Sequence, residues 1–233
     1  MKPLLIFDLD GTLADTSNDL IASLNAVLAD HKEAPVAPDS VRHLISQGAV
    51  GLLSAGFGSN YIMMPDEKKQ ILFNSFVAYY EQRMLNEIVL YPGIEAALNA
   101  LSAQGFKMAI CSNKNTNLAE HILEYLNIKH HFLAVCGGDF FVGMKKPDRG
   151  HVEGTMRLAG FDAPLAQAIF IGDAMSDLNA AKNTGIPSVF VTYGYADVTP
   201  SDSGADAIVD HADELPLAIS TLLLQMKSKE VFA

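Results

Sequence analysis

The chain has 233 residues, of which 49% are hydrophobic, and a formal net charge of −11. This length is enough for one large domain, or for a core domain with a smaller inserted one, and the apolar share supplies ample core material. The negative charge argues against binding to nucleic acid, because contact with a phosphate backbone requires clustered Lys and Arg.

The two cysteines, Cys111 and Cys136, show no CxxC spacing, so neither a disulfide framework nor a zinc site is indicated. The N-terminal apolar run is too short for the core of a signal peptide. No stretch approaches the roughly 18 consecutive apolar residues of a membrane helix. We therefore expect a protein of the reducing cytoplasm that does not bind membranes.

The first predicted element is a strand over Leu4–Phe7, whose four apolar residues show no polar alternation. This pattern indicates burial on both faces, as in a parallel sheet covered by helices. Asp8 and Asp10 follow at its carboxyl end, where open α/β sheets collect ligands. Two residues apart on an extended backbone, both carboxylates leave on the same side. They repel each other unless Mg²⁺, a shared proton or both lie between them.

Residues 17–85 are predicted to be helical, without a strand of the core sheet. Apolar residues from Leu20 to Leu28 keep a period of about 3.6 residues, which predicts a helix that opens near Ser17. A second helix is expected from about Asp39 to Ser46, and a long one from Pro65 to about Leu85. Between them lies a glycine-spaced segment, residues 48–58, with an expected glycine-rich loop around Gln47 and Gly48.

Strands and helices alternate from residue 91 onward. Strands are expected near residues 107–111, 133–136, 168–171, 188–192 and 207–209, and helices over 94–104, 117–126, 152–159, 177–183 and from about 215. This alternation predicts a doubly wound, mainly parallel α/β sheet of Rossmann-like type. The expected division is a core of residues 1–16 and 87–233, with residues 17–86 inserted as an all-helical domain.

Polar groups follow other predicted strands as well. Ser112 and Asn113 come just past residues 107–111, Lys146 precedes a proline, and Asp173 and Asp177 follow residues 168–171. If the last segment enters a helix, its two carboxylates share one face and can both serve a hard cation. Taken alone, Ser-Asn is an ordinary helix cap, Lys-Pro is usually a solvated loop, and carboxylates suit a helix N-terminus.

Together these blocks resemble the four motifs of the haloacid dehalogenase superfamily, most of whose members are phosphatases. The blocks are Asp8-Leu9-Asp10-Gly11-Thr12 continuing as Leu13-Ala14-Asp15-Thr16, then Ser112-Asn113, Lys146-Pro147, and Gly172-Asp173 to Asp177. The resemblance covers essentially the whole chain. The helical insertion after the first block looks like a cap domain of the phosphoglycolate phosphatase group. Arg149 and Ala174 depart from the common pattern, which has a second Pro and a Thr or Ser at these positions.

The resemblance implies that Asp8 is a nucleophile that becomes an aspartyl phosphate, while Asp10 acts as general acid and base. It also implies Mg²⁺ held by Asp8, the backbone carbonyl of Asp10 and Asp173, with Asp177 in support. The groups implied to hold the phosphoryl oxygens are the backbone N–H groups of Leu9 and Asp10 and the side chains of Ser112, Asn113 and Lys146.

Specificity is expected in the cap, where Arg42, Gln47, Gly48 and Arg83 are candidates to contact the leaving group. The substrate class is a small phosphorylated metabolite, either phosphoglycolate-like or a sugar phosphate. Two alternatives stay open: a phosphomutase that resembles β-phosphoglucomutase, and a catalytically silent module that binds a phospho-ligand or a partner. A dehalogenase is disfavoured because Asp10 would be superfluous there. A monomer or homodimer is expected.

Overall fold

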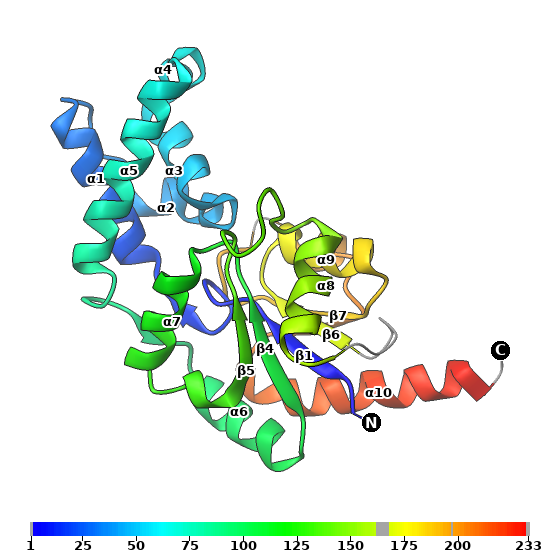
Figure 1. Cartoon of the computed structure of the whole chain (residues 1–233). Helices are drawn as coiled ribbons and strands as arrows, with labels where there is room; N and C mark the ends of the chain where they lie inside the picture. The colour runs from blue at the N-terminus through cyan, green and yellow to red at the C-terminus, as the bar shows by residue number, and fades with distance from the viewer. Residues whose placement is uncertain (1, 162–167, 197, 232–233) are drawn as a thin grey trace.

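A parallel sheet of six strands forms the centre of the computed structural model, which describes residues 2–161, 168–196 and 198–231 (Figure 1). Its order is β5-β4-β1-β6-β7-β8, so the first strand lies inside the sheet. This arrangement confirms the predicted doubly wound sheet. The strands are β1 (Leu4–Phe7), β4 (Lys107–Cys111), β5 (Phe132–Cys136), β6 (Ala168–Gly172), β7 (Ser188–Val191) and β8 (Ala207–Val209).

The side chains of β1 alternate between two apolar clusters, one on each face of the sheet. Leu5 and Phe7 pack with α6 (Ile94–Ala103), α7 (Thr116–Tyr125) and α10 (Leu215–Val231). Leu4 and Ile6 pack with α8 (Arg149–Leu158) and α9 (Met175–Thr184). All four side chains are fully buried, as expected for a central strand covered by helices on both sides. The core also contains the short 3₁₀ helices η2 (Lys129–His131), η4 (Pro200–Asp202) and η5 (Ala212–Glu214).

The register of the sheet brings three strand ends to one edge. Phe7 pairs with Ile110 of β4 on one side and with Ile171 of β6 on the other. Because the three strands are parallel, the residues that follow them leave the sheet at the same level. Asp8 therefore emerges between the segments that carry Ser112 and Asp173.

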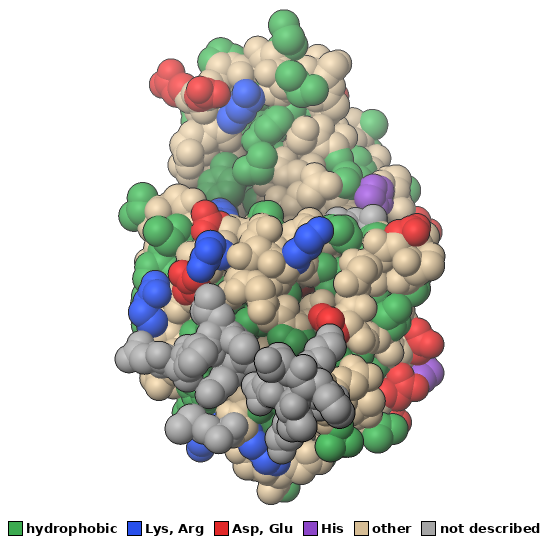
Figure 2. All heavy atoms as spheres, turned by 90° about the vertical axis from the view of Figure 1, so that its right-hand side faces the viewer, with side chains coloured by type: hydrophobic (Ala, Val, Ile, Leu, Met, Phe, Trp, Pro, Cys, Tyr) green, Lys and Arg blue, Asp and Glu red, His purple; other side chains and the backbone are tan. Residues whose placement is uncertain are grey.

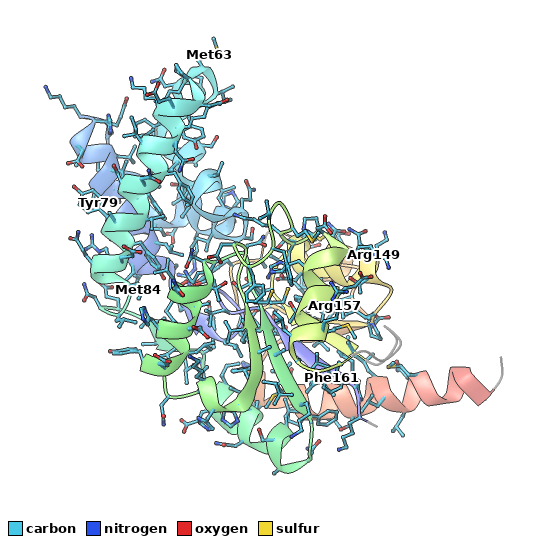
Figure 3. All side chains as sticks on the ribbon, viewed as in Figure 1. Met63, Tyr79, Met84, Arg149, Arg157 and Phe161 are labelled. Carbon is cyan, nitrogen blue, oxygen red and sulfur yellow. The ribbon has the colours of Figure 1, made fainter. Side chains whose placement is uncertain are left out.

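The helices between residues 17 and 83 form a second part that stands beyond this edge (Figure 1). Their bounds are α1 (Ser17–Asp30), α2 (Pro38–Val41), η1 (Arg42–Gln47), α3 (Gly48–Phe57), α4 (Ser59–Met63) and α5 (Asp66–Arg83). They share an apolar cluster that includes Leu24, Leu52 and Phe76. Tyr79, labelled on α5 in Figure 3, donates a hydrogen bond to Asp30 of α1 at 2.8 Å. This helical part is called the cap below.

Two short strands connect the cap to the core. β2 (Ala14–Asp15) pairs antiparallel with β3 (Val89–Leu90), with Ala14 opposite Leu90 and Asp15 opposite Val89. This pair was not predicted from the sequence, because two-residue strands carry no periodic signal.

The glycine-spaced segment after residue 47 was wrongly expected to include a loop, since the structure forms helix α3 there. Leu52, Leu53 and Phe57 bury one side of this helix, and packing outweighs its glycine content. The predicted helix over residues 39–46 is instead α2 followed by the tighter turns of η1. Gly48 has φ of +71° at the junction of η1 and α3, a conformation that glycine adopts without the steric cost of a Cβ.

None of the helices in the described ranges is long and apolar enough to cross a membrane. Figure 2 shows a face on which the narrower cap lies above the wider core, with acidic and basic side chains scattered over both. Among the side chains coloured by type on that face, Lys and Arg lie interspersed with Asp and Glu.

Candidate active site

Three carboxylates meet at the carboxyl edge of the sheet. Asp8 follows β1, Asp173 follows β6, and Asp177 lies in the first turn of α9. One oxygen of each lies within 4.8 Å of the others, and all three side chains are buried. Glycines permit this crowding: a Cβ on Gly194 would collide with Asp173 and with the backbone of Gly11.

Hydrogen bonds fix the two carboxylates of the fourth motif. Asp173 accepts from the Thr12 hydroxyl and from the backbone N–H of Tyr195, both at 2.8 Å. Asp177 accepts from the backbone N–H of Ala174 at 3.1 Å. The missing hydroxyl at Ala174 therefore leaves this backbone contact intact.

Lys146 lies between two of the acids. Its Nζ is 2.8 Å from Oδ1 of Asp8 and 2.7 Å from Oδ1 of Asp177, and the side chain is almost fully buried. Burial alone would lower the pKa of Lys146, but the neighbouring carboxylates of Asp177 and Asp8 raise it above its usual value. Lys146 is therefore a permanent cation at this edge of the sheet.

Asn113 holds the loop that carries Lys146. Its side-chain oxygen accepts from the Lys146 backbone N–H at 2.9 Å, and its amide group donates to the Lys146 carbonyl at 3.2 Å. The side chain of Asn113 thus positions the lysine, and its expected contact with phosphoryl oxygens stays a prediction. Arg149 is labelled at the start of α8 in Figure 3 and pairs with Glu153 at 2.6 Å. The departure from the family pattern at Arg149 thus falls on an exposed ion pair.

The three-carboxylate cluster suits a hard divalent cation. Apart from its ion pair with Lys146, Oδ1 of Asp8 is buried without a hydrogen-bond partner among the described residues. Burial first, and then the neighbouring Asp177 and Asp8, raise the pKa of Asp173 well above its usual value. Burial raises the pKa of Asp177 to about 6, although Lys146 opposes this shift. Such a crowded set of oxygen donors fits Mg²⁺, which neutralises adjacent carboxylates.

Asp10 lies outside this cluster and has different partners. Its Oδ1 accepts from the Thr16 hydroxyl at 2.5 Å and lies 3.2 Å from Nζ of Lys114. Leu9, between the two acids, is buried, and its carbonyl accepts the backbone N–H groups of residues 12–14. This turn separates the side chains of Asp8 and Asp10 into two environments.

A cavity of about 310 Å³ lies between the core and the cap, and Asp8 and Asp10 both line it. Ser112 and Lys146 line its core side. Its cap side is mainly apolar. The cap side chains there include Leu20, Ile45, Leu52, Phe73, Phe76, Val77 and Tyr80.

The four cap candidates fall into two groups. Gln47 and Gly48 line the cavity. Arg42 does not line it, and pairs with Asp15 of β2 at 2.6 Å. Arg83 also lies outside the lining, at the end of α5. A contact of any of the four with the leaving group stays a prediction.

Several residues at the site were not singled out from the sequence. Thr12 and Thr16 lie within the first motif block, and their hydroxyls hold Asp173 and Asp10. Lys114 directly follows the Ser-Asn pair, so its position in the second motif was an available signal. Tyr80 and Tyr195 carried no such signal, because they come close to the site only in the folded chain.

Known proteins are similar to this chain over most of its length. Residues 5–191 match the family model of haloacid dehalogenase-like hydrolases. A phosphoglycolate phosphatase of Agrobacterium fabrum is 40% identical over 210 residues, which cover 90% of this chain and 89% of that protein. A phosphoglycolate phosphatase of Caulobacter vibrioides is 35% identical, with 94% and 91% covered.

A crystal structure from Haemophilus somnus, described as a predicted phosphoglycolate phosphatase, superposes with a TM-score of 0.84. It is 28% identical, and the match covers 93% of this chain and 97% of that one. The chain therefore belongs to the haloacid dehalogenase-like hydrolases, among the phosphoglycolate phosphatase-like hydrolases of phosphoric monoesters.

Proposed function

We propose that the protein is a Mg²⁺-dependent phosphatase that hydrolyses a small phosphate monoester through an aspartyl phosphate, with phosphoglycolate as the first substrate to test. The observation that carries this proposal is the separation of Asp8 and Asp10. Asp8 lies with Lys146 and the carboxylate cluster, whereas Asp10 lies with Thr16 and Lys114. One cavity wall thus presents two acids in two environments.

These environments suit two chemical roles. A carboxylate oxygen of Asp8 would attack phosphorus in line, forming an Asp8–phosphorus bond while the bond to the ester oxygen breaks. Asp10 would give its proton to the departing oxygen and then take one from the water that cleaves the aspartyl phosphate. The products are an alcohol and inorganic phosphate, and both acids return to their starting state.

Positive charge and hydrogen-bond donors would stabilise the transferring phosphoryl group. Lys146 is a fixed cation beside Asp8, and Ser112 is a buried hydroxyl in the cavity wall. The backbone N–H groups of Leu9 and Asp10 are proposed to complete the set. When held by Asp8, the carbonyl of Asp10, and Asp173, with Asp177 in support, Mg²⁺ would offset the repulsion between nucleophile and phosphate.

The cap would exclude bulk water from this reaction. Its apolar side chains face the acids across the cavity, and a dry site strengthens every charge interaction inside it. The proposed site of action is a reducing cytoplasm, which suits the free thiols Cys111 and Cys136. A monomer or homodimer, without nucleic-acid or membrane partners, remains part of the proposal.

The test is release of inorganic phosphate from a panel of phosphate monoesters, including phosphoglycolate and sugar phosphates, with Mg²⁺ and with EDTA. We expect metal-dependent release that Asp8→Asn abolishes while its circular dichroism spectrum is unchanged. Asp210→Asn is the matched control, because Asp210 is an exposed core residue outside the motif blocks. This variant should behave as wild type. Substantial turnover by Asp8→Asn would exclude it as the nucleophile. Isomerised product without phosphate release would favour the mutase.

A further inference from the structure

Lys114 is a buried cation to which the reaction proposed above assigns no role. Its side chain is 5% exposed, and its Nζ lies 3.2 Å from Oδ1 of Asp10 and 3.0 Å from the hydroxyl of Tyr80. The same nitrogen is 4.4 Å from the centre of the Tyr80 ring. Lys114 belongs to the core and Tyr80 to α5 of the cap, so this contact joins the two parts at the cavity.

Lys114 differs from the other two cations that line the cavity. Those are Lys145 and Lys146. Lys146 is already held by Asp8 and Asp177, and Lys145 is exposed. Lys114 has a single carboxylate partner among the described ion pairs, and that partner is Asp10.

The Lys114 ammonium has three N–H donors. Its described contacts are with Asp10 and with the hydroxyl of Tyr80, so a third donor can serve a ligand in the cavity that Lys114 lines. A substrate carboxylate would accept a charge-assisted hydrogen bond from this buried ammonium, which a neutral alcohol cannot match.

We propose that Lys114, oriented by Tyr80, binds a carboxylate on the leaving group and thereby selects short phosphorylated hydroxy acids over esters of neutral alcohols. This inference rests on the phosphatase function proposed above, and it deepens that function by separating the two substrate classes left open. Lys114 would then be the specificity-determining residue, and Tyr80 a positioning residue that acts through it.

The distances limit how long the leaving group is. The ester oxygen must contact Asp10, and the substrate anion must contact Nζ of Lys114, which lies 3.2 Å from the same carboxylate. If the two hydrogen bonds run side by side, the ester oxygen and the anion are only about 3–4 Å apart. A hydroxy acid with a two-carbon backbone meets this limit, because the carbon that bears its hydroxyl group is bonded directly to the carboxyl carbon.

The remaining cavity wall supports the same choice. The cap side chains that face the acids are mainly apolar, with Ile45, Leu52 and Phe76 among them. Besides Tyr80, the polar side chains on this cap wall are Ser46 and Gln47, so only some hydroxyl groups of a sugar could be paired there, and unpaired buried hydroxyls are costly. A two-carbon acid presents one anion, and Lys114 is placed to receive it.

The experiment compares two esters of equal length, phosphoglycolate and 2-hydroxyethyl phosphate, which carries an alcohol in place of the carboxylate. We expect wild type to prefer phosphoglycolate in kcat/KM. Lys114→Met should reduce that preference about 10- to 100-fold, as expected for loss of a hydrogen bond between charged groups. Lys114→Arg should keep part of the preference, and Tyr80→Phe should reduce it less than Lys114→Met.

Lys145→Met is the matched control, because it removes the neighbouring exposed cation of the cavity wall. Equal losses for both esters in Lys114→Met would overturn the proposal, since Lys114 would then act only through Asp10. Loss of the preference in Lys145→Met instead of Lys114→Met would overturn it too.

Measurements of substrate binding test the role of Lys114 independently of the phosphatase function. If wild type hydrolyses neither ester, the proposed function fails, and the dissociation constants of the two intact esters are measured by calorimetry. A preference for phosphoglycolate that Lys114→Met removes would still support the carboxylate site, and a preference that persists would reject it. Thermal melts establish that each variant is folded, and Tyr80→Phe keeps the lysine if Lys114→Met does not fold.

Discussion

Replacing Lys146 with Met removes the cation that separates two buried acids. In wild type its Nζ lies 2.8 Å from Asp8 and 2.7 Å from Asp177. Methionine has a similar length but no charge, so both carboxylates would remain buried without this partner. Breaking a buried ion pair by removing one member typically costs about 3–5 kcal/mol, because the other member is left uncompensated.

This cost translates into a change of melting temperature. At about 2.1 cal/mol/K per residue, a chain of 233 residues has an unfolding entropy of about 490 cal/mol/K. A loss of about 3–5 kcal/mol therefore lowers the melting temperature of the metal-free protein by about 6–10 °C.

The loss of stability in Lys146→Met should be larger at high pH than at low pH. Burial raises the folded-state pKa of Asp177 to about 6, above the ordinary value of 3.8. Lys146 opposes that rise, so the variant's folded-state pKa is higher still. The folded variant thus binds a proton more readily than the unfolded chain, and its stability increases as the pH falls. The destabilisation is complete above the folded-state pKa and diminishes on acidification towards the unfolded value.

Calorimetric melts in EDTA at pH 8 and pH 5 test this reasoning, with Lys145→Met as the exposed control. The double variant Lys146→Met/Asp177→Asn should recover part of the lost stability, because it removes one of the uncompensated charges. A melting temperature within about 1 °C of wild type for Lys146→Met at pH 8 would refute the argument. So would simple additivity of the two substitutions.

Three further results are expected. Because the pKa values of Asp173 and Asp177 are raised, the metal-free protein should lose stability as the pH rises from 5 to 8. Mg²⁺ should therefore raise the melting temperature more at pH 8 than at pH 5. An equal rise at both pH values would contradict this expectation. Thr12→Val should weaken Mg²⁺ binding about 10- to 100-fold in calorimetry, because its hydroxyl orients Asp173, while Thr12→Ser should not. Tyr195→Phe should lower the free energy of unfolding in urea by about 1–3 kcal/mol, since it leaves the buried N–H of Thr16 without its acceptor, and an unchanged value would count against this bond.

Local sequence patterns predicted the core well because its elements carry local signals. The apolar run of β1 and the acids that follow it are adjacent in the chain, and parallel pairing with β4 and β6 then places the strand ends together. The carboxylate cluster follows from this topology, since each acid lies within two residues of the end of a predicted strand or begins a predicted helix.

The cap was harder to predict because its contacts are long-range. Helix α3 is stabilised by burial of Leu52 and Phe57, which outweighs the poor helix propensity of its glycines. The contact between Tyr80 and Lys114 joins residues 34 positions apart, and the bond from Tyr195 to Thr16 spans 179 positions. No periodicity within a short window reports such pairs.

The pairing of β2 with β3 brings the two ends of the cap together at one point of the core. Ala14 lies opposite Leu90 and Asp15 opposite Val89, so the chain leaves the core and returns to it at the same place. For the core, everything between these strands is the loop of a hairpin, and the entropy of closing such a loop grows only slowly with its length. A longer or shorter segment between these strands would therefore change the free energy of the core only slightly, and the central strands would keep their register.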